Sequence, residues 1–179
     1  LDKRIGMLVM NLSGTKVRNV VLGILIGTAI PSAFISEASI APMFLPIAMA
    51  LYTLTSKKIG DATQLGKLLM MSIAIGCMVG APMSPTGGAR NAIMIGFLAN
   101  LGPQYEISFM QWMILGSFYT LFLGIFFAIL LPFLYKPEVD DLSDAVNTLK
   151  EDLKKHGAMT REQWMVAGIA LLMIIAWIT

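Results

Sequence analysis

Two residues carry charge inside stretches that are otherwise apolar. Glu37 comes shortly after an apolar run that ends at Pro31, and Arg90 follows a stretch rich in glycine and proline. If such stretches lie in a membrane, a charge within them is costly unless it is paired or hydrated. We therefore expect Glu37 and Arg90 to lie near each other, or each to meet a ligand. Alternatively, either side chain reaches a membrane interface along its aliphatic stem.

Two apolar regions are interrupted by small, polar and helix-breaking residues. One interruption runs from Ser32 to Ser39, and the other, Gly80–Gly88, reads GAPMSPTGG. Proline cannot continue a helix, and glycine permits turns that other residues resist. Free N–H groups at a helix N-terminus attract anions, and free carbonyl groups at a C-terminus hold cations. The two interruptions are therefore candidate ion-binding breaks, although a packing kink would also explain the second one.

The elements that must position these residues are membrane helices. Hydrophobic residues make up 56% of the chain, charged residues 13%, and the mean hydropathy is +0.74. A soluble domain carries about 25% charged residues. The uncharged segment from Phe109 to Leu134 is long enough, at about 1.5 Å per residue, to cross a hydrocarbon core of roughly 30 Å. The sequence predicts an all-α polytopic protein of the cell (inner) membrane, with the lipid bilayer as a partner.

Composition also excludes several kinds of site. The chain has one cysteine, Cys77, and one histidine, His156, which lies in a charged stretch. A disulfide framework and a thiolate metal site are therefore ruled out. Neither a Ser–His dyad within the apolar regions nor a zinc ligand set is available. We expect no enzymatic activity, no organic cofactor and no nucleic-acid partner.

Composition divides the chain into six segments. They are an amphipathic N-terminal segment (1–15), a helical hairpin (16–56), a broken transmembrane helix (67–101), a transmembrane helix (109–135), an amphipathic surface helix (138–158) and the start of a next transmembrane helix (161–179). Apolar residues recur at helical spacing in 138–158, which is typical of a helix on the membrane surface or against a partner. The short last apolar run and the start without a signal peptide predict that the chain is a fragment.

The basic residues predict how these segments are oriented. Apart from Arg90, they occur before residue 19, between 57 and 67, and after 135, whereas loop 102–108 has none. Positive charge marks the cytoplasmic side, so we expect loop 102–108 outside and the other three regions inside. The hairpin 16–56 then starts and ends inside, with arms that are short for spanning. A re-entrant hairpin with its tip near mid-membrane fits best, and two short spanning helices are the alternative.

Two motifs resemble those of the divalent anion–sodium symporter family, the dicarboxylate and sulfate carriers. Ser36–Ile47, reading SEASIAPMFLPI, resembles that family's hairpin tip, Ser-Asn-Thr followed by small residues and Met-x-Leu-Pro-Ile. Gly80-Ala81-Pro82 resembles its Gly-Thr-Pro helix break, and the similarity runs nearly end to end. The resemblance implies an inverted-repeat secondary transporter of which this chain is mainly the first repeat. It also implies homodimers that move di- or tricarboxylates or sulfate with sodium by an elevator-type motion.

The resemblance also implies two sets of site residues. The sodium set is Ser32, Ser36, Glu37 and the backbone of Gly80, and the anion set is Ser36, Glu37, Ala38, Ser39, Thr86, Arg90 and Asn91. Glu37 and Ala38 replace the family's Asn and Thr, which contact the substrate carboxylate. A carboxylate repels an anion unless it is protonated or paired. Proton coupling, or cation/H⁺ exchange at Glu37, therefore stays open beside sodium-coupled anion transport, as does a membrane fragment that transports nothing.

Overall fold

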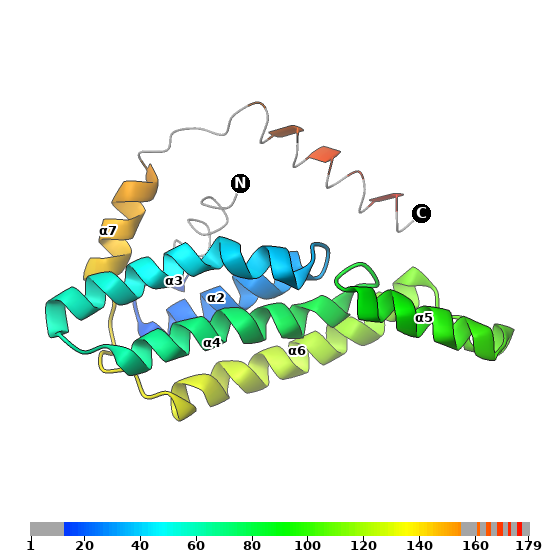
Figure 1. Ribbon diagram of the computed structural model, residues 1–179, viewed down its shortest axis with the longest axis horizontal. Helices are drawn as coiled ribbons and strands as arrows, with labels where there is room; N and C mark the ends of the chain where they lie inside the picture. The colour runs from blue at the N-terminus through cyan, green and yellow to red at the C-terminus, as the bar shows by residue number, and fades with distance from the viewer. Residues whose placement is uncertain are drawn as a thin grey trace.

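The computed structural model describes residues 13–154 and, beyond them, Arg161, Trp164, Met165, Gly168, Ile169, Leu172, Ile175 and Ala176. The elements of residues 13–154 are helices (Figure 1), which confirms the all-α prediction: α2 (Val17–Ser32), α3 (Glu37–Ile59), α4 (Thr63–Gly80), η1 (Ala81–Met83), α5 (Ala89–Leu101), η2 (Pro103–Tyr105), α6 (Phe109–Leu134) and α7 (Ser143–Lys154). Most of the predicted segments 1–15 and 161–179 lies outside the described residues, as do residues 155–158.

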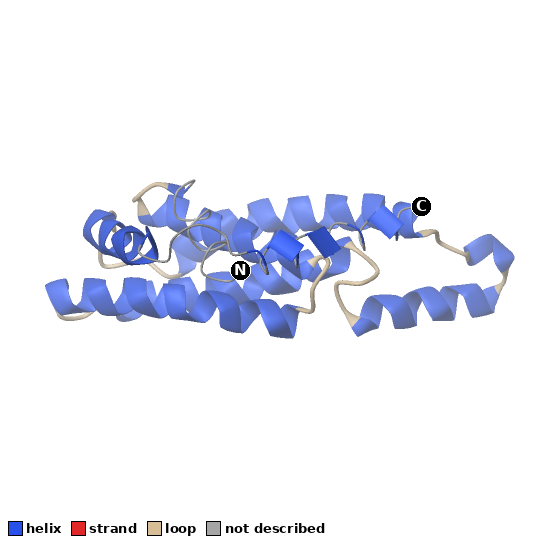
Figure 2. Cartoon of the chain, turned by 90° about the horizontal axis from the view of Figure 1, so that it is seen from above, coloured by secondary structure: helices blue, strands red, loops and turns tan. Residues whose placement is uncertain are grey.

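Helix α4 is the centre of the bundle, because it packs against α2, α3 and α6. These four helices run along the long axis of the molecule (Figure 1 and Figure 2). The approach of α2 to α4 depends on Gly76, where a Cβ atom would lie 2.0 Å from the Thr28 hydroxyl oxygen and 2.9 Å from the Leu25 carbonyl oxygen. Small residues allow this kind of close backbone approach in membrane helices.

The hairpin has unequal arms. Helix α2 has 16 residues, but α3 has 23 and continues through Pro42 and Pro46. The expectation that both arms are too short to span is therefore wrong for α3, which is long and apolar enough to cross a membrane. The sequence suggested an arm from Ile40 to Leu54 because polar and basic residues flank that apolar run. Both flanks join the helix because its length is set by backbone hydrogen bonds, which polar side chains also permit.

The broken helix is present, with boundaries that differ from the predicted 67–101. Helix α4 begins at Thr63, because the carboxylate of Asp61 accepts hydrogen bonds from the Thr63 backbone N–H (3.0 Å) and hydroxyl (2.6 Å). Asp61 precedes the N-cap residue Ala62, so this is a local turn in which an acidic side chain accepts from the backbone two residues further on. The helix then gives way to η1 and a turn before α5, which projects beyond the hairpin tip (Figure 1).

Helices α6 and α7 complete the described fold. Helix α6 opens with a capping box in which the Ser108 hydroxyl accepts from the Gln111 backbone N–H and the Gln111 side chain accepts from the Ser108 N–H. Helix α7 begins at Ser143, later than the predicted residue 138, because residues 138–142 form a loop that contacts other segments. Its buried Ala145 and Val146 belong to the core, and α7 packs against α3. Within this chain, α3 therefore covers the apolar face that the sequence assigned to a membrane surface or a partner.

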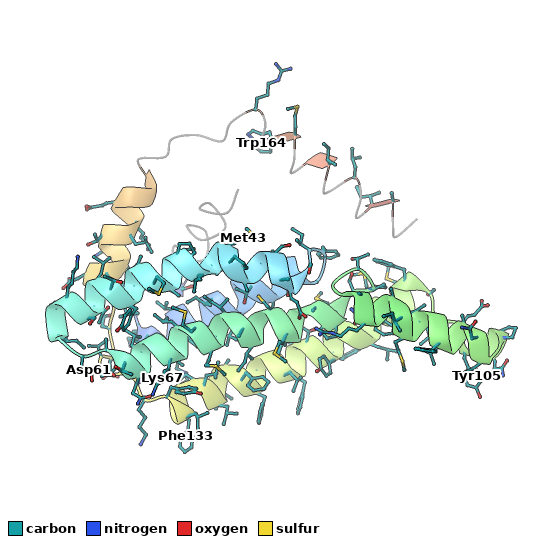
Figure 3. The ribbon with its side chains drawn as sticks, viewed as in Figure 1. Met43, Asp61, Lys67, Tyr105, Phe133 and Trp164 are labelled. Carbon is teal, nitrogen blue, oxygen red and sulfur yellow. The ribbon has the colours of Figure 1, made fainter. Side chains whose placement is uncertain are left out.

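The basic segments gather at one end of the bundle. Lys58 forms an ion pair with Asp144, and the backbone of Lys16 forms an isolated antiparallel β-bridge with that of Asp141. Asp61 and Lys67 lie at this same end, whereas Tyr105 lies at the opposite end (Figure 3). The hairpin thus starts and ends on one side, as the basic residues predicted. Within the part of the chain that the structure describes, three helices are long and apolar enough to cross a membrane, Glu37–Ile59, Thr63–Met83 and Phe109–Leu134.

Candidate functional site at the hairpin tip and the helix break

The two interruptions of the apolar segments meet in space. The Ser32 hydroxyl donates to the Cys77 carbonyl oxygen across the helix boundary (3.1 Å). A Cβ atom at Gly80 would lie 2.4 Å from the Ser32 hydroxyl oxygen, and one at Gly87 would lie 2.9 Å from the Ala33 carbonyl oxygen. The hairpin tip and the helix break therefore meet, although the contact we expected from the sequence was that of Ser36 with Gly80. Ser32 is the hydroxyl that lies against Gly80, and α2 can come this close because Gly80 has no side chain.

Glu37 and Arg90 form an ion pair across this junction. Arg90 Nη2 donates to Glu37 Oε2 at 2.7 Å, although 53 residues separate the two in sequence. This confirms that the two charges found in apolar segments are neighbours. The pair is less buried than predicted, since 55% of the Arg90 side chain and 30% of the Glu37 side chain are exposed. Exposure follows from the position of Arg90 in the first turn of α5, a helix in which Asn91 is the buried residue.

Helix dipoles explain why Arg90 needs Glu37. Helix α3 starts at Glu37, where a negative side chain is favourable because a helix N-terminus carries partial positive charge. Arg90 also lies at a helix N-terminus, that of α5, where a positive side chain is unfavourable. The Glu37 carboxylate offsets that cost. The C-terminal ends of α2 and α4, with partial negative charge, meet beside this pair at Ser32 and Gly80.

Asn91 holds the break in shape. Its side chain is 4% exposed, and its Nδ2 donates to the carbonyl oxygens of Ala81 (2.9 Å) and Ser84 (2.7 Å). The Ser84 hydroxyl in turn accepts from the Thr86 backbone N–H (3.1 Å) and shares a hydrogen bond with the Thr86 hydroxyl (2.8 Å). The sequence assigned Asn91 to the anion site. Both hydrogens of its amide are used inside the break, so the nitrogen is not free to donate to a ligand.

Helix α6 supplies two residues that sequence reasoning missed. Trp112 Nε1 donates to the Pro82 carbonyl oxygen (3.0 Å), and the Thr120 hydroxyl donates to the Val79 carbonyl oxygen (2.9 Å). Between them, a Cβ atom at Gly116 would lie 2.5 Å from the Pro82 carbonyl oxygen. The even spacing of four residues, which places all three on one helix face, was the available signal. These contacts satisfy carbonyl groups that the break removes from helical hydrogen bonding.

The remaining predicted anion-site residues lie along the first turn of α3 and in the break. Ser36, Ala38 and Ser39 are exposed, and Thr86 is half-buried. Ser36 is the N-cap residue of α3, but its side chain makes no capping hydrogen bond. Among the described residues no three His, Cys, Asp or Glu side chains cluster as metal ligands. A cation at this junction would be held by hydroxyl and carbonyl oxygens, which suit hard cations.

A separate cavity of about 430 Å³ lies between α2, α4 and α6. Its lining is almost entirely apolar, from Leu22 on α2 to Ala128 on α6, with Ser117 and Thr120 as the polar side chains. The lining contains no charged residue, so it is unsuited to an ion. The ion-binding candidate is therefore the junction of tip and break.

Comparisons with known proteins show the family to which the chain is similar. The model of the family described as the sodium:sulfate symporter transmembrane region matches residues 1–179. The chain is 26% identical over 187 residues to the sodium-dependent dicarboxylate transporter SdcS of Staphylococcus aureus (strain USA300), covering 100% of this chain and 36% of the relative. It is 29% identical over 122 residues to the citrate/succinate antiporter of Escherichia coli (strain K12), covering 66% of this chain and 24% of the relative. A membrane protein of Cupriavidus necator is 22% identical over 184 residues, covering 100% of this chain and 34% of that protein. The chain therefore spans about a third or less of the length of these relatives.

Proposed function

This chain belongs to the family of sodium:sulfate symporter transmembrane regions, and we propose that it provides one half of the ion-binding core of a secondary transporter. The transporter moves a small anion of the di- or tricarboxylate or sulfate class across the cell membrane, coupled to sodium. One observation carries the proposal: two helix C-termini and two helix N-termini converge where Ser32 meets Gly80 and Glu37 meets Arg90. The helix C-termini, with partial negative charge, attract a cation, and the neighbouring helix N-termini, with partial positive charge, attract an anion.

The sodium site lies on the C-terminal side of the junction. The Ser32 hydroxyl keeps its lone pairs after donating its hydrogen, and a carbonyl oxygen near the ends of α2 and α4 that accepts one hydrogen bond keeps a second lone pair for a cation. Ser36, Glu37 and the Gly80 carbonyl complete the oxygen set. All of these are hard ligands that suit sodium, and binding at this position ties the hairpin to α4.

The anion site lies on the N-terminal side of the junction. Arg90 provides the positive charge, and the first turns of α3 and α5 provide backbone N–H groups. Ser36, Ala38, Ser39 and Thr86 line the approach, and Asn91 keeps the break in the conformation that aims Arg90 at the tip. A guanidinium recognises carboxylate and sulfate through paired N–H groups. The proposal requires no catalytic group, because transport moves the anion without changing it.

Uptake of labelled succinate, citrate and sulfate into proteoliposomes tests this function, with and without an inward sodium gradient. The protein used is the full-length transporter that carries this segment, including the second repeat that we propose as its partner. We expect uptake of at least one anion that rises with the sodium gradient. Arg90→Gln should abolish uptake, and Lys67→Gln, at the other end of the bundle, should leave it unchanged. Absence of uptake for all three anions would sink the proposal.

A second candidate is coupling to protons, including cation/H⁺ exchange, and the observation that favours it is Glu37 itself. A carboxylate in the first turn of α3 can exchange a proton and thereby lose or regain its pairing with Arg90. The same proteoliposomes distinguish the two: a pH gradient without sodium should drive uptake if protons couple, and should not if sodium does.

We also propose that the transporter is a homodimer. The support is the resemblance of the tip and break motifs to carriers that act as dimers. Light scattering of the detergent-solubilised full-length protein should give twice the protomer mass. A monomer mass would contradict this part of the proposal.

A further inference from the structure

The contact between Glu37 and Arg90 is a single one. One terminal nitrogen of the guanidinium, Nη2, meets one carboxylate oxygen, Oε2. A guanidinium offers five N–H donors, and its strongest anion contacts are bidentate, with two parallel hydrogen bonds. The structure therefore leaves Arg90 with donors to spare, and more than half of its side chain is exposed. An external anion can reach the same guanidinium and match it better than Glu37 does.

Charge at the junction is balanced. Positions 19–56 contain no basic residue, and Arg90 is the only one in positions 68–135. Glu37 is the only acidic residue in positions 19–56. The pair together is neutral, so it attracts a dianion only weakly. A dianion bound to Arg90 beside a retained Glu37 carboxylate would meet like-charge repulsion. The anion gains the full attraction of Arg90 only when the ion pair between Glu37 and Arg90 breaks.

From this geometry we infer that the Glu37 carboxylate is an internal competitor for Arg90, displaced by the transported dianion when it binds. The inference rests on the proposed function and adds to it a specificity and control element. Glu37 holds the guanidinium while no substrate is bound, which offsets the cost of a cation at the N-terminus of α5. The Glu37 carboxylate also lowers the affinity for monoanions, because a single negative charge that replaces it at Arg90 gains no additional electrostatic attraction.

Displacement has a mechanical consequence. Helix α5 contacts little of the described fold, and the polar side-chain contacts that join it to the rest are those of Arg90 and Asn91. Asn91 ties α5 to its own break, so Arg90 is the contact between α5 and the hairpin tip. Anion binding thus removes the ion pair that holds tip and α5 together. Substrate binding thereby allows the hairpin tip and α5 to move relative to each other.

The test uses the full-length transporter in proteoliposomes and compares Glu37→Gln with Glu106→Gln. Both variants remove one negative charge, but Glu106 lies in the exposed loop before α6. The half-saturating concentrations of succinate and sulfate should fall about fivefold in Glu37→Gln, because the competing contact is a partly exposed ion pair of modest strength. Glu106→Gln should match the wild type. Arg90→Lys, which keeps the charge but loses the paired donors, should raise both values.

The outcomes separate this inference from the proposed function. If the wild type transports but Glu37→Gln shows an unchanged or higher half-saturating concentration, Glu37 either only stabilises the fold or binds the substrate, and the inference is overturned. If no variant transports any anion, the proposed function fails and the inference fails with it. Should Glu37→Gln not fold, Glu37→Asn is measured instead, since asparagine is the residue found at this position in the similar family. The unfolding midpoint of each variant should stay close to that of the wild type while the half-saturating concentration changes, since a purely structural role would shift the unfolding midpoint.

Discussion

The two polar regions of this molecule hold the chain in different ways. At the end where Lys58 and Asp144 pair, which we call the charged end, carboxylates cap helices and tie loops together. Glu138 there accepts hydrogen bonds from the backbone N–H groups of Gln64 (2.7 Å) and Leu65 (3.0 Å) at the start of α4. At the junction of tip and break, buried hydroxyl and amide groups satisfy the backbone, and one ion pair joins the hairpin tip to α5.

This difference separates scaffold from site. The charged end uses many exposed contacts, each weak in water, and none of them needs to change. The junction uses a few buried contacts that fix the backbone and leaves its single ion pair accessible. Under the proposed function, an ion replaces a contact at the junction, whereas the contacts of the charged end only stabilise the fold. Each of the following predictions tests this division.

The largest effect is expected at Gly80. A Cβ atom there would lie 2.1 Å from the Ala29 carbonyl oxygen and 2.4 Å from the Ser32 hydroxyl oxygen. Because part of this clash is with backbone, Gly80→Ala should lower stability by about 3 kcal/mol and abolish uptake. Gly96→Ala is the matched control, since nothing lies within 4 Å of its Cβ position. Thermal unfolding in detergent should show Gly96→Ala stabilised by about 1 kcal/mol, and equal behaviour of the two variants would contradict the close approach.

The second effect is expected at Asn91. Asn91→Ala leaves the buried carbonyl oxygens of Ala81 and Ser84 without their donor, which should cost about 2 kcal/mol. Uptake should fall further than stability does, because the break no longer aims Arg90 at the tip. Asn100→Ala, at an exposed position of the same helix, should change neither quantity measurably. A loss of stability with full uptake would show that the break need not be rigid.

The third effect concerns pH at the charged end. Burial raises the pKa of Glu138, but the hydrogen bonds from the Gln64 and Leu65 N–H groups outweigh it, so the pKa is lowered. A depressed pKa in the fold contributes stability above the ordinary glutamate pKa and loses it as pH falls through the folded value. The contribution is small because Glu138 is exposed, on the order of 0.5 kcal/mol. The difference in unfolding midpoint between wild type and Glu138→Gln should therefore shrink as pH falls below the ordinary glutamate pKa of about 4.3 and vanish once pH lies below the lowered pKa in the fold; a difference that stays constant over this range would contradict the prediction.

The smallest effect is expected for Lys58 and Asp144. Their side chains are 69% and 70% exposed, so water screens the pair almost completely. A double-mutant cycle with Lys58→Ala and Asp144→Ala should give additive unfolding midpoints. The same cycle with Glu37→Gln and Arg90→Gln, also read by unfolding midpoints, should be clearly non-additive, because the Glu37 side chain is only 30% exposed. If the exposed pair shows the larger coupling, the division into scaffold and site is wrong.

Several features of this protein were readable from residue types and order. Apolar length predicted the helices, because a segment in lipid must satisfy its own backbone hydrogen bonds. The exclusion of charge from lipid made Glu37 and Arg90 conspicuous and predicted that they pair. Glycine and proline marked the break at residues 80–88. The grouping of basic residues predicted that the hairpin starts and ends on one side of the bundle.

Helix boundaries were less predictable, and the reason is local. The α4 start depends on the turn that Asp61 forms with Thr63, and the α3 start on the backbone geometry at Ser36, neither of which alters hydropathy. Hydropathy measures how much a segment gains by leaving water. A helix ends where its hydrogen bonds end, and side chains of any polarity can lie in its last turns.

Tertiary structure alone decided which polar groups serve the fold and which stay free for ions. The spacing of four residues places Trp112 and Thr120 on one face of α6, but it does not say that they donate to carbonyl oxygens of the break, or that both amide hydrogens of Asn91 are used there. The residue type fixes how many hydrogen bonds a group can make. Its partner depends on which helix lies within about 3 Å, and packing between distant segments sets that distance. Arg90 keeps spare donors because α5 projects away from that packing.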